Sequence, residues 1–236
     1  MFDLSLDLIA LPQERHIDTV LKKIDCKLVH SSKAKNYLSL EQDILYFHSI
    51  NFKKPLSFNP ARGKTAFRLN RSEQEGLIKK ALGKLSPDAI IFDATAGLLN
   101  DALIMCNLGY KVIAAEQSKI LHTMLSLGLL NYPKAKNLTI ICGDSKDLSL
   151  KHNFDAIFFD PMFESSGSAL RDKQFRMIKE ILTLEPIQNN NHKTFEQLRS
   201  IPDKKLIVKR PIKAKPFSED VNYQVKGRSI RYDVYI

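Results

Sequence analysis

The sequence predicts an α/β protein with a doubly wound, mostly parallel sheet, a C-terminal antiparallel hairpin and a small N-terminal α/β subdomain. Between residues 89 and 209, short apolar runs alternate with longer helical patterns. This alternation is typical of parallel strands that are joined by right-handed helical crossovers and covered on both faces. Near the C-terminus, Gly227 separates two strand-like stretches, as in a hairpin. We therefore expect one main sheet with a hairpin added to it.

Length and composition fit this fold class. The chain has 236 residues, of which 44% are hydrophobic and 26% charged, so it can bury a core and is typical of globular proteins. We predict a subdomain over residues 1–50, a basic connecting arm over 51–70 and the main domain over 71–236. No apolar run reaches membrane-spanning length, and the N-terminus lacks a signal-peptide pattern. These features predict a cytoplasmic protein without a membrane partner.

The cysteines predict neither a disulfide framework nor a zinc site. They are odd in number, far apart and outside any C-x-x-C pair: Cys26, Cys106 and Cys142. This usage fits a reducing compartment and a protein without a structural metal.

The N-terminal subdomain shows mixed patterns. A stripe of apolar residues predicts a helix over 12–24, and strand-like stretches follow at 26–30 and 44–47. We expect these elements to form a small layer separate from the main sheet.

The basic arm carries turn residues, so residues 51–69 are expected to be irregular; these turn residues are Pro55, Pro60 and Gly63. A helix over 72–82 follows. Ser72 is its predicted N-cap, and Glu75 lies three residues later, as in a capping box.

The main domain is predicted from alternating strands and helices. The predicted strands are 89–93, 111–115, 138–142, 156–159 and 206–209, and the predicted helices are 100–108, 118–130 and 168–184. The hairpin strands are expected at 223–225 and 230–235. Residues 185–202 are expected to form a loop with at most one helical turn.

The positive charge is confined to two stretches. The formal net charge is +10, and residues 51–84 contribute +7 and residues 204–236 contribute +6, while the rest of the chain is slightly acidic. Aromatic residues lie among these charges: Phe52, Phe58, Phe67, Phe217, Tyr223 and Tyr232. This segregation favours a nucleic-acid-binding rim on a neutral body. The alternative is a charged surface that serves only solubility.

The strand ends carry the candidate ligand-binding residues, because ligands of such sheets bind beyond the carboxyl ends of the strands. The first strand is followed by a turn of small residues at Gly97, but Leu99 and Ala102 break the G-x-G-x-x-G pattern for pyrophosphate. Glu116 is placed to bind ribose hydroxyls, and Asp144 to bind an adenine amine. Asp144 is alternatively a helix cap or turn former. With Asp93, three successive strands end in acidic residues, which favours a ligand that contains adenosine but no phosphates.

The fourth strand ends in Asp160-Pro161-Met162-Phe163. An Asp-Pro pair alone is typical of a turn. At this strand end, however, an acid, a rigid proline and an aromatic ring can together hold an exocyclic amine on a planar base. The motif therefore indicates chemistry on such an amine.

These motifs resemble those of the Rossmann-like S-adenosylmethionine-dependent methyltransferases, and within that class the J-type guanine-N2 methyltransferases of bacterial 16S ribosomal RNA. The resemblance covers about residues 70–236. It rests on DATAGL at 93–98 with Asp101, DPMF at 160–163, Ser168-Ala169-Leu170 with Lys173 and Arg176, VKRP at 208–211, and Lys226-Gly227 with Asp233 and Tyr235.

The resemblance implies roles for individual residues. It implies S-adenosylmethionine contacts from residues at the strand ends: Asp93, Ala94, Gly97, Asn100, Asp101, Glu116, Gln117, Asp144, Ser145 and Asp160. It implies that Asp160 and the Pro161 carbonyl orient the guanine amine and that Phe163 stacks on the base. The chain departs from the family pattern at Leu99, Asn100, Gln117 and Asp144.

The implied partner is 16S ribosomal RNA or the small ribosomal subunit, and no metal is implied. Candidate RNA contacts lie in the basic stretches and after the DPMF motif: Lys53, Lys54, Arg62, Lys64, Arg68, Arg71, Lys173, Arg176, Lys209, Arg210, Lys213 and Lys215. Two alternatives stay open. One is methylation of another base amine, such as adenine N6, and the other is a non-catalytic RNA-binding protein that keeps the fold.

Overall fold

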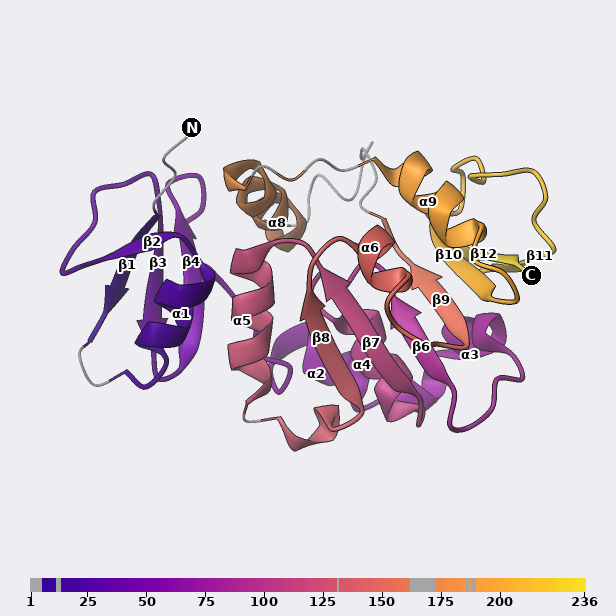
Figure 1. Cartoon of the computed structure of the whole chain (residues 1–236). Helices are drawn as coiled ribbons and strands as arrows, with labels where there is room; N and C mark the ends of the chain where they lie inside the picture. Colours follow the sequence, from indigo (N-terminus) through magenta and orange to yellow (C-terminus); the bar gives the residue numbers. More distant parts are fainter. Residues whose placement is uncertain (1–5, 12–13, 131, 162–172, 186, 188–189) are drawn as a thin grey trace. The chain divides into compact units, whose positions relative to one another are not determined.

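A computed structural model describes residues 6–11, 14–130, 132–161, 173–185, 187 and 190–236 (Figure 1). The chain forms two compact units, each assembled from three segments. The first unit contains residues 1–62, 118–133 and 164–187, and the second contains residues 63–117, 134–163 and 188–236. The division of the sequence into domains 1–50, 51–70 and 71–236 stays a prediction.

The first unit is built on a five-stranded sheet in the order β2-β1-β3-β4-β5. Its strands are β1 (Leu6–Ala10), β2 (Cys26–Val29), β3 (Asn36–Glu41), β4 (Ile44–Ser49) and β5 (Leu56–Ser57). Strand β1 is parallel to β2 and β3, whereas β3, β4 and β5 are antiparallel. The helices of this unit are α1 (Ile17–Lys23), α5 (Lys119–Leu129) and α8 (Lys173–Leu184). The small mixed sheet confirms the predicted N-terminal α/β piece, although β1, β3 and β5 were not predicted.

Helix α5 is the central helix of the first unit. It packs against β4, α1 and α8. Ser118 caps its N-terminus, because the Ser118 hydroxyl oxygen accepts a hydrogen bond from the Leu121 N–H at 3.0 Å. Gly128 allows close approach, since a Cβ atom there would lie 2.5 Å from the Phe58 carbonyl oxygen.

The second unit is built on a seven-stranded sheet in the order β11-β12-β10-β9-β6-β7-β8. Its strands are β6 (Ile90–Asp93), β7 (Lys111–Glu116), β8 (Leu138–Cys142), β9 (Ala156–Phe159), β10 (Lys205–Pro211), β11 (Tyr223–Lys226) and β12 (Ile230–Tyr235). Strands β8, β7, β6, β9 and β10 are parallel, and β12 and β11 are antiparallel additions. The predicted fold class is confirmed.

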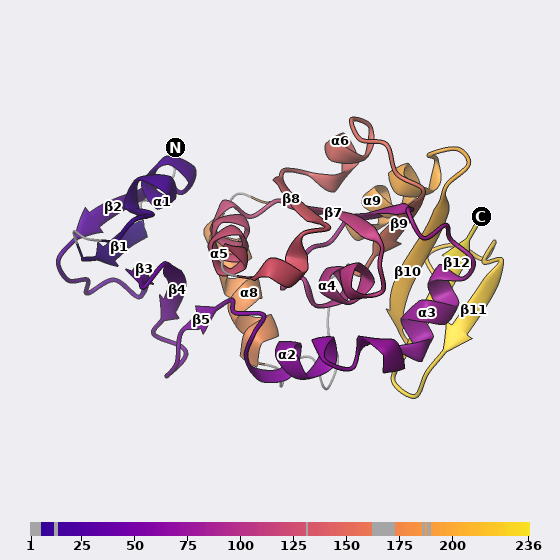
Figure 2. The same cartoon turned by 90° about the horizontal axis from the view of Figure 1, so that it is seen from below.

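Helices cover both faces of this sheet. They are α2 (Gly63–Leu69), α3 (Gly76–Leu82), α4 (Asn100–Asn107), α6 (Ser145–Ser149) and α9 (Asn191–Arg199). Helix α4 packs against β7 and β8 and contacts α2, while α3 packs against the hairpin strands. Helix α6 packs against β7 and α9, and Figure 2 shows α2 and α6 on opposite sides of the strands. One core layer includes Phe92, Phe159, Phe195, Val208 and Tyr235. Within the described residues, no helix is long and apolar enough to cross a membrane.

Two predicted loops contain helices. Residues 63–69 of the basic arm form α2, which packs against α4. Residues 191–199 form α9, whose N-cap Asn190 accepts a hydrogen bond from the Lys193 N–H at 3.0 Å. Both predictions were wrong because turn-forming residues at the start of each helix were interpreted as breaks in structure.

The predicted helix over 72–82 is divided into two. Residues 72–74 form a 3₁₀ turn and α3 begins only at Gly76. The predicted capping box is absent: the Ser72 hydroxyl donates to the Leu69 carbonyl, and the Glu75 carboxylate accepts from Arg68. Glu75 therefore binds the Arg68 side chain and does not cap the helix.

Candidate active site

The ends of two neighbouring parallel strands, β6 and β9, are tied together by hydrogen bonds. The Ala94 N–H donates to the Phe158 carbonyl at 2.9 Å, and the Asp160 N–H donates to the Thr95 hydroxyl oxygen at 2.7 Å. The Thr95 N–H in turn donates to Asp93 Oδ1 at 3.0 Å. The loop after β6 thus fixes the backbone at the start of the DPMF motif.

Lys209 on β10 joins two carboxylates. Its Nζ donates to Asp101 Oδ2 at 2.6 Å and to Asp160 Oδ2 at 2.7 Å. Arg68 approaches the other oxygen of Asp101, with Nη2 at 3.3 Å from Oδ1, and its Nε donates to Glu75 at 2.9 Å. Helices α2 and α4 and strand β10 therefore converge beyond the end of β9.

We call Asp93, Asp101, Asp160, Arg68 and Lys209 the acid–lysine cluster. Burial raises the pKa of Asp93 to about 7, and the Asp101 and Asp160 carboxylates add to this effect. Burial also raises the pKa of Asp160, against the attraction of Lys209. Burial would raise the pKa of Asp101, but Lys209 and Arg68 outweigh it and the pKa is lowered. Likewise the carboxylates outweigh the burial of Lys209 and raise its pKa.

The turn between β6 and α4 is compact and strained. Gly97 has φ of +53°, and Leu99 takes a left-handed conformation with φ of +57° where α4 begins. The Ala96 N–H donates to the Ala115 carbonyl on β7 at 3.1 Å. Asn100 Oδ1 accepts from the Thr65 hydroxyl at 2.8 Å. Two of the predicted cofactor residues, Asn100 and Asp101, thus hold α2 in place through side-chain contacts.

The next two strand ends are also joined. The Gly143 N–H after β8 donates to the Glu116 carbonyl at the end of β7 at 2.9 Å. Glu116 is buried, with 8% of its surface exposed. Asp144 caps α6, since Oδ1 accepts from the Lys146 N–H at 2.9 Å and Oδ2 lies 3.0 Å from Lys146 Nζ. The cap interpretation thus applies to Asp144, and its predicted contact with adenine stays a prediction.

The residues at these strand ends fit an adenosine-bearing cation without phosphates. Carboxylates lie at the ends of β6, β7 and β8, and the turn at Gly97 contains small residues. Acidic side chains suit ribose hydroxyls and a positive sulfonium, and they repel phosphate. S-adenosylmethionine is therefore the group that these residues would hold, with Gln117 directly after β7 and Ser145 at the start of α6.

The described residues include only part of the DPMF motif. Asp160 and the buried Pro161 lie directly after β9. Met162 and Phe163 lie outside the described residues, as do Ser168, Ala169 and Leu170. The predicted stacking by Phe163 stays a prediction.

Most of the predicted RNA contacts with described side chains are exposed cations. The exposed ones are Lys53, Lys54, Arg62, Arg71, Arg176, Lys213 and Lys215, and the side chain of Lys64 is outside the described part of the chain. Three differ from the expectation because their charged groups make contacts within the second unit. Arg68 and Lys209 bind carboxylates, and Arg210 is buried with its guanidinium over the Phe217 ring at 4.3 Å.

An aromatic ring in the first unit gathers several of the predicted cations. Lys173 Nζ and the Arg176 guanidinium lie 5.9 and 5.2 Å from the centre of the Phe52 ring. Lys173 also donates to the Lys54 carbonyl at 2.6 Å. We call Phe52, Lys53, Lys54, Lys173 and Arg176 the Phe52 group. A ring beside guanidinium and ammonium groups can stack on a base while the cations bind phosphates.

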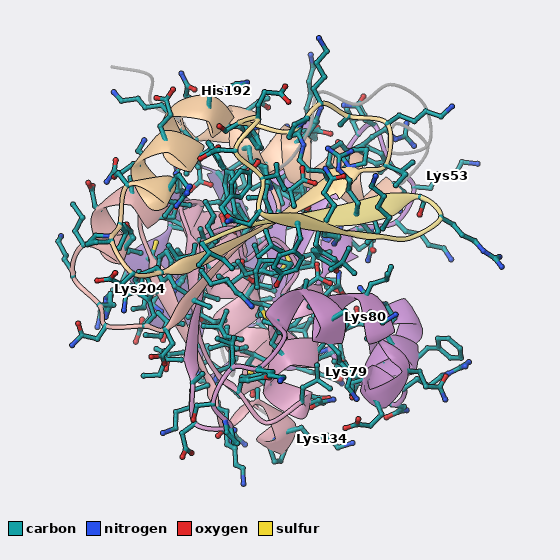
Figure 3. All side chains as sticks on the ribbon, turned by 90° about the vertical axis from the view of Figure 1, so that its right-hand side faces the viewer. Lys53, Lys79, Lys80, Lys134, His192 and Lys204 are labelled. Carbon is teal, nitrogen blue, oxygen red and sulfur yellow. The ribbon has the colours of Figure 1, made fainter. Side chains whose placement is uncertain are left out.

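Sequence reasoning missed several residues of the site. Thr95 was recognised only as part of a motif, although it links two strand ends, and Glu75 was assigned to a cap. Outside the site, Lys79 and Lys80 on α3 are exposed (Figure 3). Both lie within the basic stretch 51–84, and Lys79 pairs with Glu73 at 2.9 Å.

Comparison with known proteins agrees with this geometry. A family model described as "Putative SAM-dependent methyltransferase" matches residues 22–236. Ribosomal RNA small subunit methyltransferase J of Alcanivorax borkumensis is 36% identical over 192 residues, which are 77% of this chain and 75% of that protein. The protein of the same name from Francisella tularensis subsp. novicida is 27% identical over 244 aligned positions, covering 98% and 99% of the two chains.

A solved structure shares the fold over almost the whole chain. A crystallised SAM-dependent methyltransferase from Neisseria gonorrhoeae superposes with a TM-score of 0.73 and 21% identity, covering 98% of this chain and 95% of that one. At this identity, the likeness supports the fold.

Proposed function

Because the chain belongs to the ribosomal RNA small subunit methyltransferase J family, we propose that it methylates the exocyclic N2 amine of a guanosine in 16S ribosomal RNA. S-adenosylmethionine is the methyl donor. The substrate places the reaction in the cytoplasm, where small ribosomal subunits are assembled.

The acid–lysine cluster carries this proposal. Asp160 Oδ2 is bound to Lys209, whereas no donor in the described part of the chain contacts Asp160 Oδ1. This oxygen is available to accept a hydrogen bond from an amine N–H. The rigid Pro161 follows directly, so the acceptor lies on a fixed backbone.

When bound, S-adenosylmethionine supplies a methyl group on a positively charged sulfur, and the methyl passes to N2 while the bonding electron pair stays on sulfur. The chain's own residues position the amine. Asp160 Oδ1 and the Pro161 carbonyl orient the two N–H groups, so that the nitrogen lone pair points towards the methyl group. The Asp160 carboxylate also stabilises the positive charge that develops on N2. Because N2 becomes acidic once methylated, its extra proton leaves to Asp160 or water without a strong base.

Binding of RNA is assigned to exposed cations and to the Phe52 group. Phosphate contacts supply affinity that depends on salt, and a stacked ring offsets part of the cost of extruding a base. Replacing Lys53 and Lys54 by Gln should flatten the dependence of RNA affinity on salt concentration. Replacing Lys33 and Lys35, which are exposed outside the two basic stretches, is the matched control. An unaltered slope in the first variant would place the RNA elsewhere.

The product nucleoside tests the proposed function. The purified protein is incubated with labelled S-adenosylmethionine and small-subunit RNA or subunits from cells that lack it, and the RNA is digested to nucleosides. We expect label in N2-methylguanosine, and none with RNA from cells that contain the protein. Label in N6-methyladenosine would establish the other amine methylation. Binding of RNA with neither label nor heat on titration with S-adenosylhomocysteine would establish a non-catalytic RNA-binding protein.

A further inference from the structure

We infer that Lys209 is a positioning residue for methyl transfer, which holds one oxygen of Asp160 and leaves the other directed at the substrate amine. The inference rests on the proposed function and adds a residue to it. The predicted role of Lys209 was a contact with RNA phosphate, and its ion pairs inside the second unit oppose that role.

The geometry of Lys209 supports a link between two parts of the site. Its ammonium contacts Asp101 at the start of α4 and Asp160 after β9, at 2.6 and 2.7 Å. The side chains of Asp101, Lys209 and Asp160 are 8%, 19% and 32% exposed, so the contact with Asp101 is more shielded from water than the contact with Asp160. An ammonium that contacts two carboxylates restricts the rotamers of both, because breaking either contact separates opposite charges. Lys209 therefore connects the turn that would hold the methyl donor to the acid that would hold the amine.

The charges around Asp160 explain why a cation is required. Lys209 from β10 and Asp101 from α4 act on it directly, Arg68 from α2 and Asp93 from β6 lie nearby, and Tyr232 from β12 shares the same surroundings. Without Lys209, the Asp160 carboxylate would face the Asp101 carboxylate with only Arg68 to balance the two charges. Like charges at close range favour the protonated form of a carboxyl group. A protonated Asp160 would be a poor acceptor for a hydrogen bond from the amine, and it could not stabilise the positive charge that develops on N2.

The chain offers a matched control on the same strand. Lys205 is four residues before Lys209, on the same face of β10, and its Nζ donates to the Leu82 carbonyl at 2.8 Å. Both lysines are half-buried. Lys205 thus differs from Lys209 in having a carbonyl and the Tyr223 ring, whose centre is 5.9 Å from Nζ, as partners instead of two carboxylates.

The test compares Lys209→Met, Lys209→Arg and Lys205→Met with the wild-type protein. The pH profile of kcat/KM for RNA methylation is measured from pH 5.5 to 9.5, with the thermal midpoint of each variant. In Lys209→Met we expect the acidic limb to move to higher pH by about one to three pH units, the usual effect of one close opposite charge. Activity should therefore recover partly at high pH. Lys209→Arg should keep the wild-type limb, and Lys205→Met should lower the thermal midpoint without moving the limb.

The outcomes separate the two proposals. If the wild-type protein forms no N2-methylguanosine, the proposed function fails. If the wild type is active but the acidic limb of Lys209→Met stays in place, the role of Lys209 in positioning is wrong. That role is also wrong if Lys209→Met alters only the salt dependence of RNA binding. This result would instead support the predicted contact of Lys209 with an RNA phosphate. If Lys209→Met does not fold, Lys209→Arg decides. An acidic limb of its kcat/KM profile that lies about one to three pH units above that of the wild type overturns the inference, and an acidic limb at the wild-type pH supports it.

Discussion

Two ion clusters of the second unit differ in how completely their charges are paired. Arg231 and Asp233 on β12 form a pair in which Asp233 accepts from Arg231 at 2.7 and 3.0 Å and from Gln224 at 2.8 Å. Arg231 Nη1 donates to the Pro211 and Ile212 carbonyls at 3.1 and 2.8 Å. One charge balances the other, and both carboxylate oxygens have donors.

The acid–lysine cluster contains three acids and two cations, and one oxygen of Asp160 lacks a donor among the described residues. A balanced pair with filled hydrogen bonds has no further capacity for a ligand, so it serves stability. A cluster with an additional acid and an Asp160 oxygen that can still accept a hydrogen bond is suited to bind a ligand that carries a hydrogen-bond donor or a positive charge. The contrast thus separates a structural pair from a candidate site within one unit.

The contrast predicts the largest effect for Asp233→Ala. Because this change leaves the Arg231 charge buried and unpaired, it should lower the free energy of unfolding by about 3 to 5 kcal/mol, measured by urea denaturation. The double variant Arg231→Met with Asp233→Leu is the control and should lose much less. A single variant as stable as the wild type would show that the pair is not buried in solution.

Asp160→Asn should have the next largest effect, and on activity rather than on stability. Loss of one aligned electrostatic group costs about 10²- to 10³-fold in turnover. We therefore expect methyl transfer to fall by this factor while the thermal midpoint stays near that of the wild type. Activity within tenfold of the wild type would remove Asp160 from the chemistry.

Asp93→Asn should change how the free energy of unfolding depends on pH. The pKa of Asp93 is raised to about 7 in the folded chain, whereas an unfolded Asp titrates near 3.9, so between these values only the folded state keeps the proton. Stability from this group therefore falls as the pH rises, by about 1.4 kcal/mol over one pH unit near pH 6. Asp93→Asn should remove this slope. Identical slopes in both proteins would mean that Asp93 is ionised throughout.

Gln224→Ala should have the smallest effect, because it removes one neutral donor from a pair that keeps two others. We expect the free energy of unfolding to fall by about 0.5 to 1.5 kcal/mol, with methyl transfer unchanged. A loss of activity beyond the loss of folded protein would show that the Arg231–Asp233 pair also shapes the site.

The fold was largely predictable from sequence, because periodic apolar runs and turn residues are local signals. Strands such as β6 and β9 and the hairpin at Gly227 followed from them. Helix α2 was missed because Pro60 and Gly63 lie at its start, and its stability depends on packing against α4. The N-terminal strands β1 and β3 carry polar residues that blur their alternation.

The candidate site was predictable only as a set of strand ends. Asp93 and Asp160 were selected because acids after parallel strands meet at one edge of a sheet. The pairing of Lys209 with Asp101 joins residues 108 positions apart, and no local pattern indicates it. A lysine in a basic stretch therefore suggested RNA, although its charge is used inside the protein.

The connectivity of the two units limits how the chain can be divided. It passes from one unit to the other after residues 62, 117, 133, 163 and 187, so neither unit is a continuous piece of the gene. A chain that begins at residue 63 would retain α5 but lose the β4 surface against which α5 packs. The N-terminal sheet therefore cannot be removed as an independent domain, because its removal would expose the apolar face of α5. Cutting the chain where it passes between the units would give fragments and not folded domains.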